Sequence, residues 1–221
     1  MSDNDCCCEG TEVFSLPKLN EPAPEFEAKT TDGVKKLSDY KGRWLVLFSH
    51  PADFTPVCTT EFIGFAKHYE EFQALNTDLL GLSIDSIYSH IAWIRAIKEK
   101  FGVEIPFPII EDLSMNVAHK YGMVQPGAST TQAVRTVFVI DDKGVLRAMV
   151  YYPLENGRSI PEFVRLVKAL QTSDANHVAT PEGWQPGDKV IVPPPATKAA
   201  AEARMNEGYE CTDWFFCKKE I

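Results

Sequence analysis

Short apolar runs alternate with segments of helical periodicity in the first half of this chain, and this alternation restricts the fold more than any other feature. Residues 44–48 and 79–84 are apolar runs of strand length, each followed by polar or turn residues. Aromatic residues recur at helical spacing between the two runs, namely Phe62, Phe65, Tyr69 and Phe72. Helical periodicity returns after residue 86. Because this order places consecutive strands parallel with right-handed crossovers, we predict an α/β protein.

The second half of the chain predicts antiparallel pairing as well. Residues 136–140 and 145–152 are strand-like and flank the sequence Asp-Asp-Lys-Gly at 141–144, which is typical of a hairpin turn. Residues 107–110 predict one further short strand. We therefore expect a mixed β-sheet flanked by helices.

The carboxyl-terminal part of the sequence has the character of an extended arm. A capping box at Ser159 and Glu162 predicts the start of a helix. Residues 172–195 then form a long connection rich in proline, followed by a short helix over 199–205 and an aromatic end at 211–217. Because such an apolar end needs a surface on which to dock, we expect a homodimer or a larger homo-oligomer.

These patterns divide the chain of 221 residues into three parts. Residues 1–12 are expected to be a flexible tail that contains Cys6, Cys7 and Cys8. Residues 13–171 are expected to form one main domain, and residues 172–221 a dimerisation arm.

Charge and the amino terminus narrow the class of protein. Thirty-one acidic residues against 22 basic ones give a formal net charge of -9, which repels nucleic acid and anionic lipid surfaces. The first ten residues are acidic and lack the apolar core of a secretory signal, and no apolar run is long enough to span a bilayer. We therefore expect a cytoplasmic protein without nucleic acid or membrane partners. In a reducing compartment its six cysteines are expected to be reactive and not permanent crosslinks.

Cys58 lies where the first strand meets the aromatic-striped helix. Thr55 precedes a proline and suits the cap position of a helix, and Pro56 suits its first residue. Cys58 then falls in the first helical turn, where unpaired backbone N–H groups and the helix dipole favour the thiolate over the thiol. The alternative is a buried cysteine that acts only as a small apolar side chain. The combination of cap, proline and junction favours an activated nucleophile.

The spacing Pro-x-x-x-Thr-x-x-Cys, formed by Pro51, Thr55 and Cys58, resembles the peroxidatic signature of the peroxiredoxins. The full sequence of residues 48–61 resembles that of the one-cysteine subgroup of this family. The resemblance continues through residues 135–141 and the carboxyl-terminal arm. It implies a thioredoxin-like fold and a thiol-specific peroxidase that reduces hydrogen peroxide and organic hydroperoxides without a cofactor or metal.

The resemblance also implies a role for each residue of the segment. Cys58 would attack the peroxide and become a sulfenic acid. The Thr55 hydroxyl and the Cys58 backbone N–H would hold the two peroxide oxygens, Arg135 would stabilise the thiolate and the leaving oxygen, and Pro51 would shield the pocket. Two of these residues also have a simpler interpretation. Thr55 could be a helix cap alone, and Arg135 a cation at the rim of a strand.

His50 and Glu61 are further candidates for the substrate pocket. Each also has an ordinary explanation, because a buried histidine is often a packing residue and a glutamate in a first turn complements the helix dipole.

The sulfenic acid must be resolved by a second thiol. The tail resembles that of longer-tailed members of the subgroup in which carboxyl-terminal cysteines resolve the peroxidatic cysteine across a dimer, which favours Cys217 as resolver and Cys211 as an accessory. Their Cys-x5-Cys spacing is a poor match to zinc sites. Adjacent Cys6, Cys7 and Cys8 cannot readily bridge one another, and no family counterpart assigns them a role.

Some relatives in this subgroup resemble dual enzymes that carry a phospholipase serine in a Gly-x-Ser-x-Gly context shortly before the peroxidatic segment. The corresponding window, residues 41–45, has Arg43 in place of that serine, so this second activity is not expected. The expected partners are a peroxide, an external thiol reductant that is thioredoxin-like or a small thiol, and further copies of the chain, up to a ring such as a decamer. An oligomeric redox-regulated chaperone or signalling scaffold is the alternative function, and metal storage by the cysteine-rich ends is a weaker one.

Overall fold

The computed structural model describes residues 16–221, so the expected tail at residues 1–12, with Cys6, Cys7 and Cys8, lies outside the described residues. Seven strands form the main sheet in the order β2-β1-β5-β4-β3-β6-β7. Their bounds are β1 Glu27–Thr30, β2 Gly33–Lys36, β3 Trp44–Ser49, β4 Thr77–Ser83, β5 Ile109–Glu111, β6 Arg135–Ile140 and β7 Leu146–Tyr152. Strand β3 pairs parallel with β4 and antiparallel with β6, which confirms the mixed sheet.

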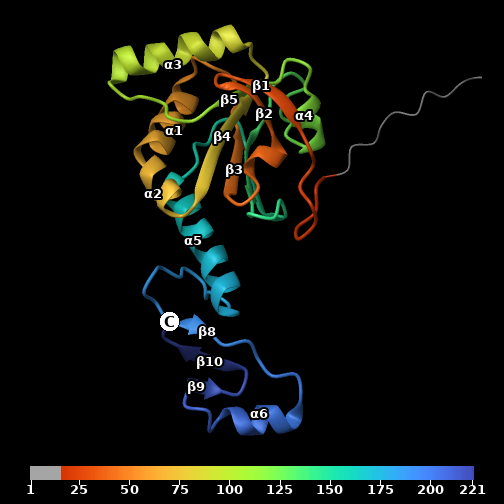
Figure 1. Ribbon diagram of the computed structural model, residues 1–221, viewed down its shortest axis with the longest axis vertical. Coiled ribbons are helices and arrows are strands. Elements are labelled where there is room, and N and C mark those ends of the chain that lie inside the picture. The colour runs from red at the N-terminus through yellow and green to blue at the C-terminus, as the bar shows by residue number, and fades with distance from the viewer. Residues whose placement is uncertain (1–15) are drawn as a thin grey trace, which may run out of the picture.

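Helices cover both faces of this sheet (Figure 1). Their bounds are η1 Leu37–Tyr40, α1 Pro56–Lys67, α2 Tyr69–Ala74, α3 Ile87–Phe101, α4 Asn116–Lys120, α5 Ile160–Asn176 and α6 Lys198–Arg204. The main sheet has an apolar core on each of its two faces. Successive side chains of a strand point to opposite faces, so alternate residues of β3 pack into different cores. Val46 and Phe48 pack with α1, α3 and α5, whereas Leu45 and Leu47 pack with α4 and η1. The expected α/β architecture is therefore confirmed.

The single aromatic-striped helix expected over residues 62–72 is instead two helices. Helix α1 ends at Lys67, and His68 leaves helical geometry with φ -102° and ψ 8° before α2 begins. The His68 imidazole contacts the Gly64 carbonyl at 2.9 Å through Nδ1, so the side chain satisfies backbone at the break. The aromatic stripe still packs on one face, with Phe62, Phe65 and Phe72 all fully buried.

The helix expected to begin at Ser159 is present as α5, but the capping box is not. Ser159 occupies the cap position and makes no side-chain capping hydrogen bond. The Glu162 carboxylate instead accepts two hydrogen bonds from Arg165, at 2.6 and 2.7 Å. A bidentate charged pair on the helix surface therefore replaces the reciprocal cap.

The carboxyl-terminal arm contains a small unit of its own at the far end of α5 (Figure 1). Helix α5 continues to Asn176, five residues beyond the expected domain boundary at 171. After it, β8 Val190–Ile191, β9 Glu210–Asp213 and β10 Phe216–Lys219 form a three-stranded sheet in the order β8-β10-β9. An apolar cluster of Ala169, Val178, Trp184 and Val190 fixes this unit to α5. Within the described part of the chain, no helix has the length and apolarity that crossing a bilayer requires.

Candidate active site

Cys58 lies in the first turn of α1, as the sequence predicts. Thr55 is the cap residue with extended geometry, φ -101° and ψ 147°, and Pro56 is the first helical residue. The Cys58 side chain is fully buried, and Cys58 is a free thiol. The sulfur is therefore shielded from water in the helical turn whose backbone N–H groups have no intrahelical partners.

Thr55 occupies the expected cap position, but its side chain does not cap the helix. Its hydroxyl donates to the Ala52 carbonyl at 2.9 Å. The hydroxyl oxygen accepts no hydrogen bond from the backbone N–H groups of the helix. Phe54, just before it, has a left-handed backbone with φ 57°, a conformation that is unusual for a bulky residue. The chain thus makes a tight turn that brings residue 55 to the start of α1.

Arg135 joins Cys58 from the neighbouring strand. It is the first residue of β6 and is almost fully buried, with 3% of its surface exposed. Its Nη1 donates to the Cys58 sulfur at 3.3 Å and to Glu61 Oε2 at 2.7 Å, and its Nε donates to the Leu154 carbonyl at 2.9 Å. These three contacts fix the guanidinium against the sulfur.

Glu61 lies one turn after Cys58 on α1 and binds two arginines. Arg158 donates to Oε1 from its Nε and its backbone N–H, each at 2.8 Å, and to Oε2 from Nη2 at 2.9 Å. Burial opposes ionisation of this carboxyl, but the hydrogen bonds and charge of Arg158, with a contribution from Arg135, hold the pKa of Glu61 below its ordinary value. The structure therefore places Glu61 behind the arginine, where it orients Arg135.

Acid is expected to destabilise the protein through Glu61. A carboxyl whose folded pKa is depressed contributes stability above its unfolded pKa of about 4.3, and this contribution is lost as pH falls toward the lower folded value. The thermal unfolding midpoint should therefore fall with pH below about 4.3, and Glu61→Gln should flatten that part of the profile. A variant profile that runs parallel to the wild-type profile would contradict the coupling.

Arg158 is a site residue that was not predicted from the sequence. Its Nη1 also donates to the Thr136 carbonyl at 2.6 Å, and its guanidinium lies 5.6 Å from the ring centroid of Phe48. It lies in an irregular segment 97 positions from Glu61, so no periodicity signals its place. With two arginines and one carboxylate, the buried cluster carries one excess positive charge, next to the sulfur.

Pro51 and His50 follow β3 directly, and both are buried. The His50 ring packs against Phe62 and Trp93, with centroids 4.7 and 5.1 Å apart, and its Nε2 contacts Asp53 Oδ1 at 2.9 Å. His50 was thus predicted from the sequence, whereas its carboxylate partner Asp53 was not.

A metal centre is the other chemistry to test at this place. Among the described residues, one group has ligand atoms within 4.8 Å of one another, His50, Asp53 and Asp85. The Asp53 oxygens already contact two histidine rings, and Asp85 Oδ2 accepts from the Ser83 hydroxyl at 2.7 Å and the Asp53 backbone N–H at 3.1 Å. These side chains fit a hydrogen-bond network better than a metal site.

Cys211 and Cys217 lie together in the arm, where they form a disulfide within the chain. They are partners across the β9–β10 pair. Cys217 is buried and Cys211 is partly exposed. The structure therefore brings the two tail cysteines to each other, while Cys58 remains a free thiol.

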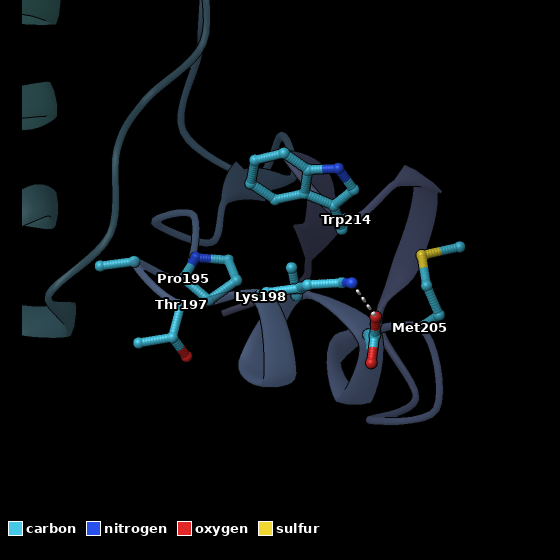
Figure 2. Close-up of a pocket in the computed structure, with 8 residues that line it drawn as sticks. Pro195, Thr197, Lys198, Met205 and Trp214 are labelled. Atoms are coloured by element: carbon cyan, nitrogen blue, oxygen red, sulfur yellow. Dashed lines mark ion pairs between the residues drawn. The ribbon is translucent and has the colours of Figure 1, made fainter.

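Two apolar pockets lie near the residues described above, one in the main domain and one in the carboxyl-terminal arm. One of about 490 Å³ lies between α1 and α3 and is lined by residues that include Phe54, Thr55 and Trp93. The other, of about 600 Å³, lies in the arm between α6 and Trp214 (Figure 2). The larger pocket is therefore away from Cys58, and the smaller one reaches Thr55.

Comparison with known proteins gives the same class as the fold and site. The AhpC/TSA family matches residues 19–149, and the C-terminal domain of 1-Cys peroxiredoxin matches residues 169–208. A peroxiredoxin of Aquifex aeolicus is 62% identical over 95% of this chain and all of its own length. A peroxiredoxin of Methanosarcina mazei is 55% identical over 93% of this chain and 98% of its own length.

Solved structures agree with these relatives. The yeast mitochondrial 1-Cys peroxiredoxin is 40% identical and superposes with a TM-score of 0.83, covering 93% of this chain and 100% of its own. A mutant of the peroxiredoxin 6 of Arenicola marina is 34% identical with a TM-score of 0.81, covering 93% of this chain and 99% of its own. The fold is thus the thioredoxin-like fold of thiol-dependent peroxidases with a carboxyl-terminal extension. The chain belongs to the peroxiredoxin family, which makes it an oxidoreductase that uses a peroxide as substrate and a thiol as reductant.

Proposed function

We propose that Cys58 is the peroxidatic nucleophile and that Arg135 is its electrostatic partner. The observation that carries this proposal is the 3.3 Å contact from Arg135 Nη1 to the Cys58 sulfur at the start of α1. A thiolate at this position neutralises the one excess positive charge of the Arg135, Arg158 and Glu61 cluster. Burial makes that compensation strong, because charges attract more in a medium of low dielectric constant.

The reaction follows from this arrangement. The Cys58 thiolate attacks the terminal oxygen of a hydroperoxide, an S–O bond forms, and the O–O bond breaks. The departing oxygen takes the electron pair and a proton and leaves as water or an alcohol, and Cys58 becomes a sulfenic acid. Arg135 is already aimed at the sulfur, so it can also stabilise the negative charge that develops on the departing oxygen.

Thr55 and Pro51 shape the peroxide pocket in this proposal. Because the Thr55 hydroxyl donates its proton to Ala52, its oxygen remains free to accept the O–H of a peroxide. The backbone N–H of Cys58, in the first turn of α1, is free of an intrahelical partner and can donate to the second peroxide oxygen. Pro51 is buried beside His50 and has no N–H to offer, so it limits water in the pocket.

The tail cysteines complete the cycle. The Cys217 thiol of a partner subunit attacks the sulfenic acid, releases water and forms a disulfide with Cys58. Cys211 then displaces Cys58 from that disulfide, which gives the Cys211–Cys217 bond seen in the arm. An external thiol donor reduces this bond and returns both tail thiols. Partial exposure of Cys211 supports the last step, because the attacking donor needs access to a sulfur.

Residues 172–221 act as the dimerisation arm of the peroxidase domain at residues 13–171. The tip of the arm exposes Trp214, Phe215 and Phe216, three adjacent aromatic residues that a second subunit can cover. Trp214 also lines the pocket beside α6, where Lys198 pairs with Glu202 (Figure 2).

Non-reducing peptide mapping tests the cycle. After one equivalent of peroxide, Cys211→Ser is expected to accumulate a Cys58–Cys217 link between chains, because the second exchange step is blocked. Wild-type protein is expected to show mainly the Cys211–Cys217 link, and Cys217→Ser a persistent sulfenic acid at Cys58. A Cys58–Cys211 link in Cys217→Ser at the wild-type rate would contradict the assignment of Cys217 as resolver.

A further inference from the structure

A buried carboxylate between two histidine rings lies beside the proposed peroxide site. Asp53 Oδ1 contacts His50 Nε2 at 2.9 Å, and Asp53 Oδ2 contacts His90 Nδ1 at 2.8 Å. His90 Nε2 contacts the Ile110 carbonyl at 3.0 Å. Neither histidine ring is exposed, and only 1% of the Asp53 side chain is. The network joins the loop before α1 to α3 and β5.

The hydrogen bonds of this network need one proton more than two neutral histidines and an ionised carboxyl supply. A carbonyl oxygen can only accept, so His90 Nε2 must carry a proton. Each of the two contacts with Asp53 needs a proton between nitrogen and oxygen as well. The three hydrogen bonds thus need three protons, whereas two neutral rings supply two.

The third proton belongs to the hydrogen bond between His90 Nδ1 and Asp53 Oδ2, because this contact is left without a proton when each ring carries only one. Burial opposes ionisation of Asp53, but hydrogen bonds from His50 and His90 outweigh it and lower the pKa of Asp53 well below its ordinary value. Burial lowers the pKa of His50, against the opposing effect of Asp53. Asp53 is thus the carboxylate and His50 the neutral ring.

This distribution fixes the tautomer of His50. Its Nε2 donates to Asp53, so its Nδ1 is an unprotonated acceptor. Among the described residues, His50 Nδ1 is one of two buried side-chain polar atoms without a hydrogen-bond partner. Buried acceptors without a partner in the protein are rare.

We propose that His90 is a positioning residue that carries two ring protons and, through Asp53, holds the loop from His50 to Thr55 with His50 Nδ1 free as a hydrogen-bond acceptor. The effect on catalysis rests on the proposed function of Cys58, because this loop carries Pro51 and Thr55. The protonation pattern itself does not depend on that function.

Nitrogen NMR of the histidine rings tests the proton count directly. In the full-length reduced protein at neutral pH, His90 is expected to show two protonated nitrogens and His50 a protonated Nε2 alone. Signals are assigned by their loss in His90→Gln and His50→Gln. A neutral His90 ring in the wild-type protein would overturn the proposal.

Asp53→Asn provides the matched variant. An amide of the same shape can accept from His50 Nε2 and donate to His90 Nδ1, so every hydrogen bond survives with two protons. His90 is therefore expected to lose one ring proton in this variant, while His50 keeps its tautomer. An unchanged His90 signal in a folded Asp53→Asn protein would contradict the network.

Kinetics then separate positioning from mere packing. His90→Leu removes both N–H donors and is expected to slow Cys58 oxidation by about 10-fold to 10²-fold, the scale of a small misplacement of reacting groups. The ring signals of His50 are expected to change with it. An unchanged oxidation rate together with unchanged His50 signals would overturn the positioning role. Peroxide turnover that persists without Cys58 would instead overturn the proposed function and leave the NMR result standing.

Discussion

Replacing Cys58 by serine is expected to abolish peroxide consumption. Serine has nearly the same shape and can still accept from Arg135 at the position of the sulfur, so the buried site should keep its packing. The serine hydroxyl is not ionised at neutral pH and is a far weaker nucleophile than a thiolate. Loss of a catalytic nucleophile costs on the order of 10⁶ in rate in a well-studied protease. Turnover should therefore fall to the uncatalysed background, measured as loss of peroxide with excess thiol reductant.

The matched control is Cys217→Ser, which removes a buried cysteine of the arm and leaves Cys58 in place. It should still consume one equivalent of peroxide per chain in a single turnover. Undiminished turnover in Cys58→Ser would contradict the assignment of the nucleophile. Cys58→Ser also separates a catalyst from an oligomeric redox-regulated scaffold. Holdase activity that survives Cys58→Ser and depends on assembly size would indicate the scaffold.

Local sequence signals were sufficient for the elements that carry Cys58. The apolar run of β3, the threonine and proline at residues 55 and 56, and the aromatic stripe of α1 are all contained within about 25 consecutive residues. Each has a physical cause that acts over one or two turns, such as φ restriction by proline or the burial of one helix face. The junction that positions the sulfur was therefore predictable.

The partners of the site were less predictable, because they come from distant segments. Arg135 was found only because it begins an apolar strand within a family motif. Arg158 and His90 reach Glu61 and Asp53 over 97 and 37 positions, and neither lies in a pattern that signals a polar role. His90 lies within a helix whose apolar face predicts packing alone. Tertiary contacts of single side chains leave no periodic trace in a sequence.

Side-chain capping was also wrong in detail at both helix starts. Thr55 and Ser159 occupy the expected cap positions, yet neither accepts a capping hydrogen bond. The Thr55 hydroxyl is turned to Ala52, and the Glu162 carboxylate to Arg165. A competing partner decides where a hydroxyl or carboxylate points, and sequence spacing alone does not show that competitor.

Arg135→Met is expected to slow oxidation of Cys58 by roughly 10² to 10³, the usual cost of removing one donor that stabilises developing charge. Methionine fills much of the same space but offers no N–H to the sulfur or to the departing oxygen. Glu61 keeps its hydrogen bonds to Arg158, so the carboxylate is not left unpaired and the fold should survive. Stopped-flow measurement of the first oxidation step isolates this effect from resolution by the tail.

Two further substitutions show whether the loss comes from geometry or from charge. Arg135→Lys keeps the charge, but one ammonium group cannot reproduce the planar fork that contacts Cys58, Glu61 and the Leu154 carbonyl together, so an intermediate rate is expected. Arg147→Met is the control, because Arg147 also pairs with carboxylates, those of Asp141 and Asp174, but contacts no residue of the site. This substitution should leave the rate of Cys58 oxidation unchanged. A rate for Arg135→Met within about threefold of the wild type would be less than 1 kcal/mol of transition-state stabilisation. That value is too small for a donor aimed at the reacting sulfur, and it would move the electrostatic role to the helix start alone.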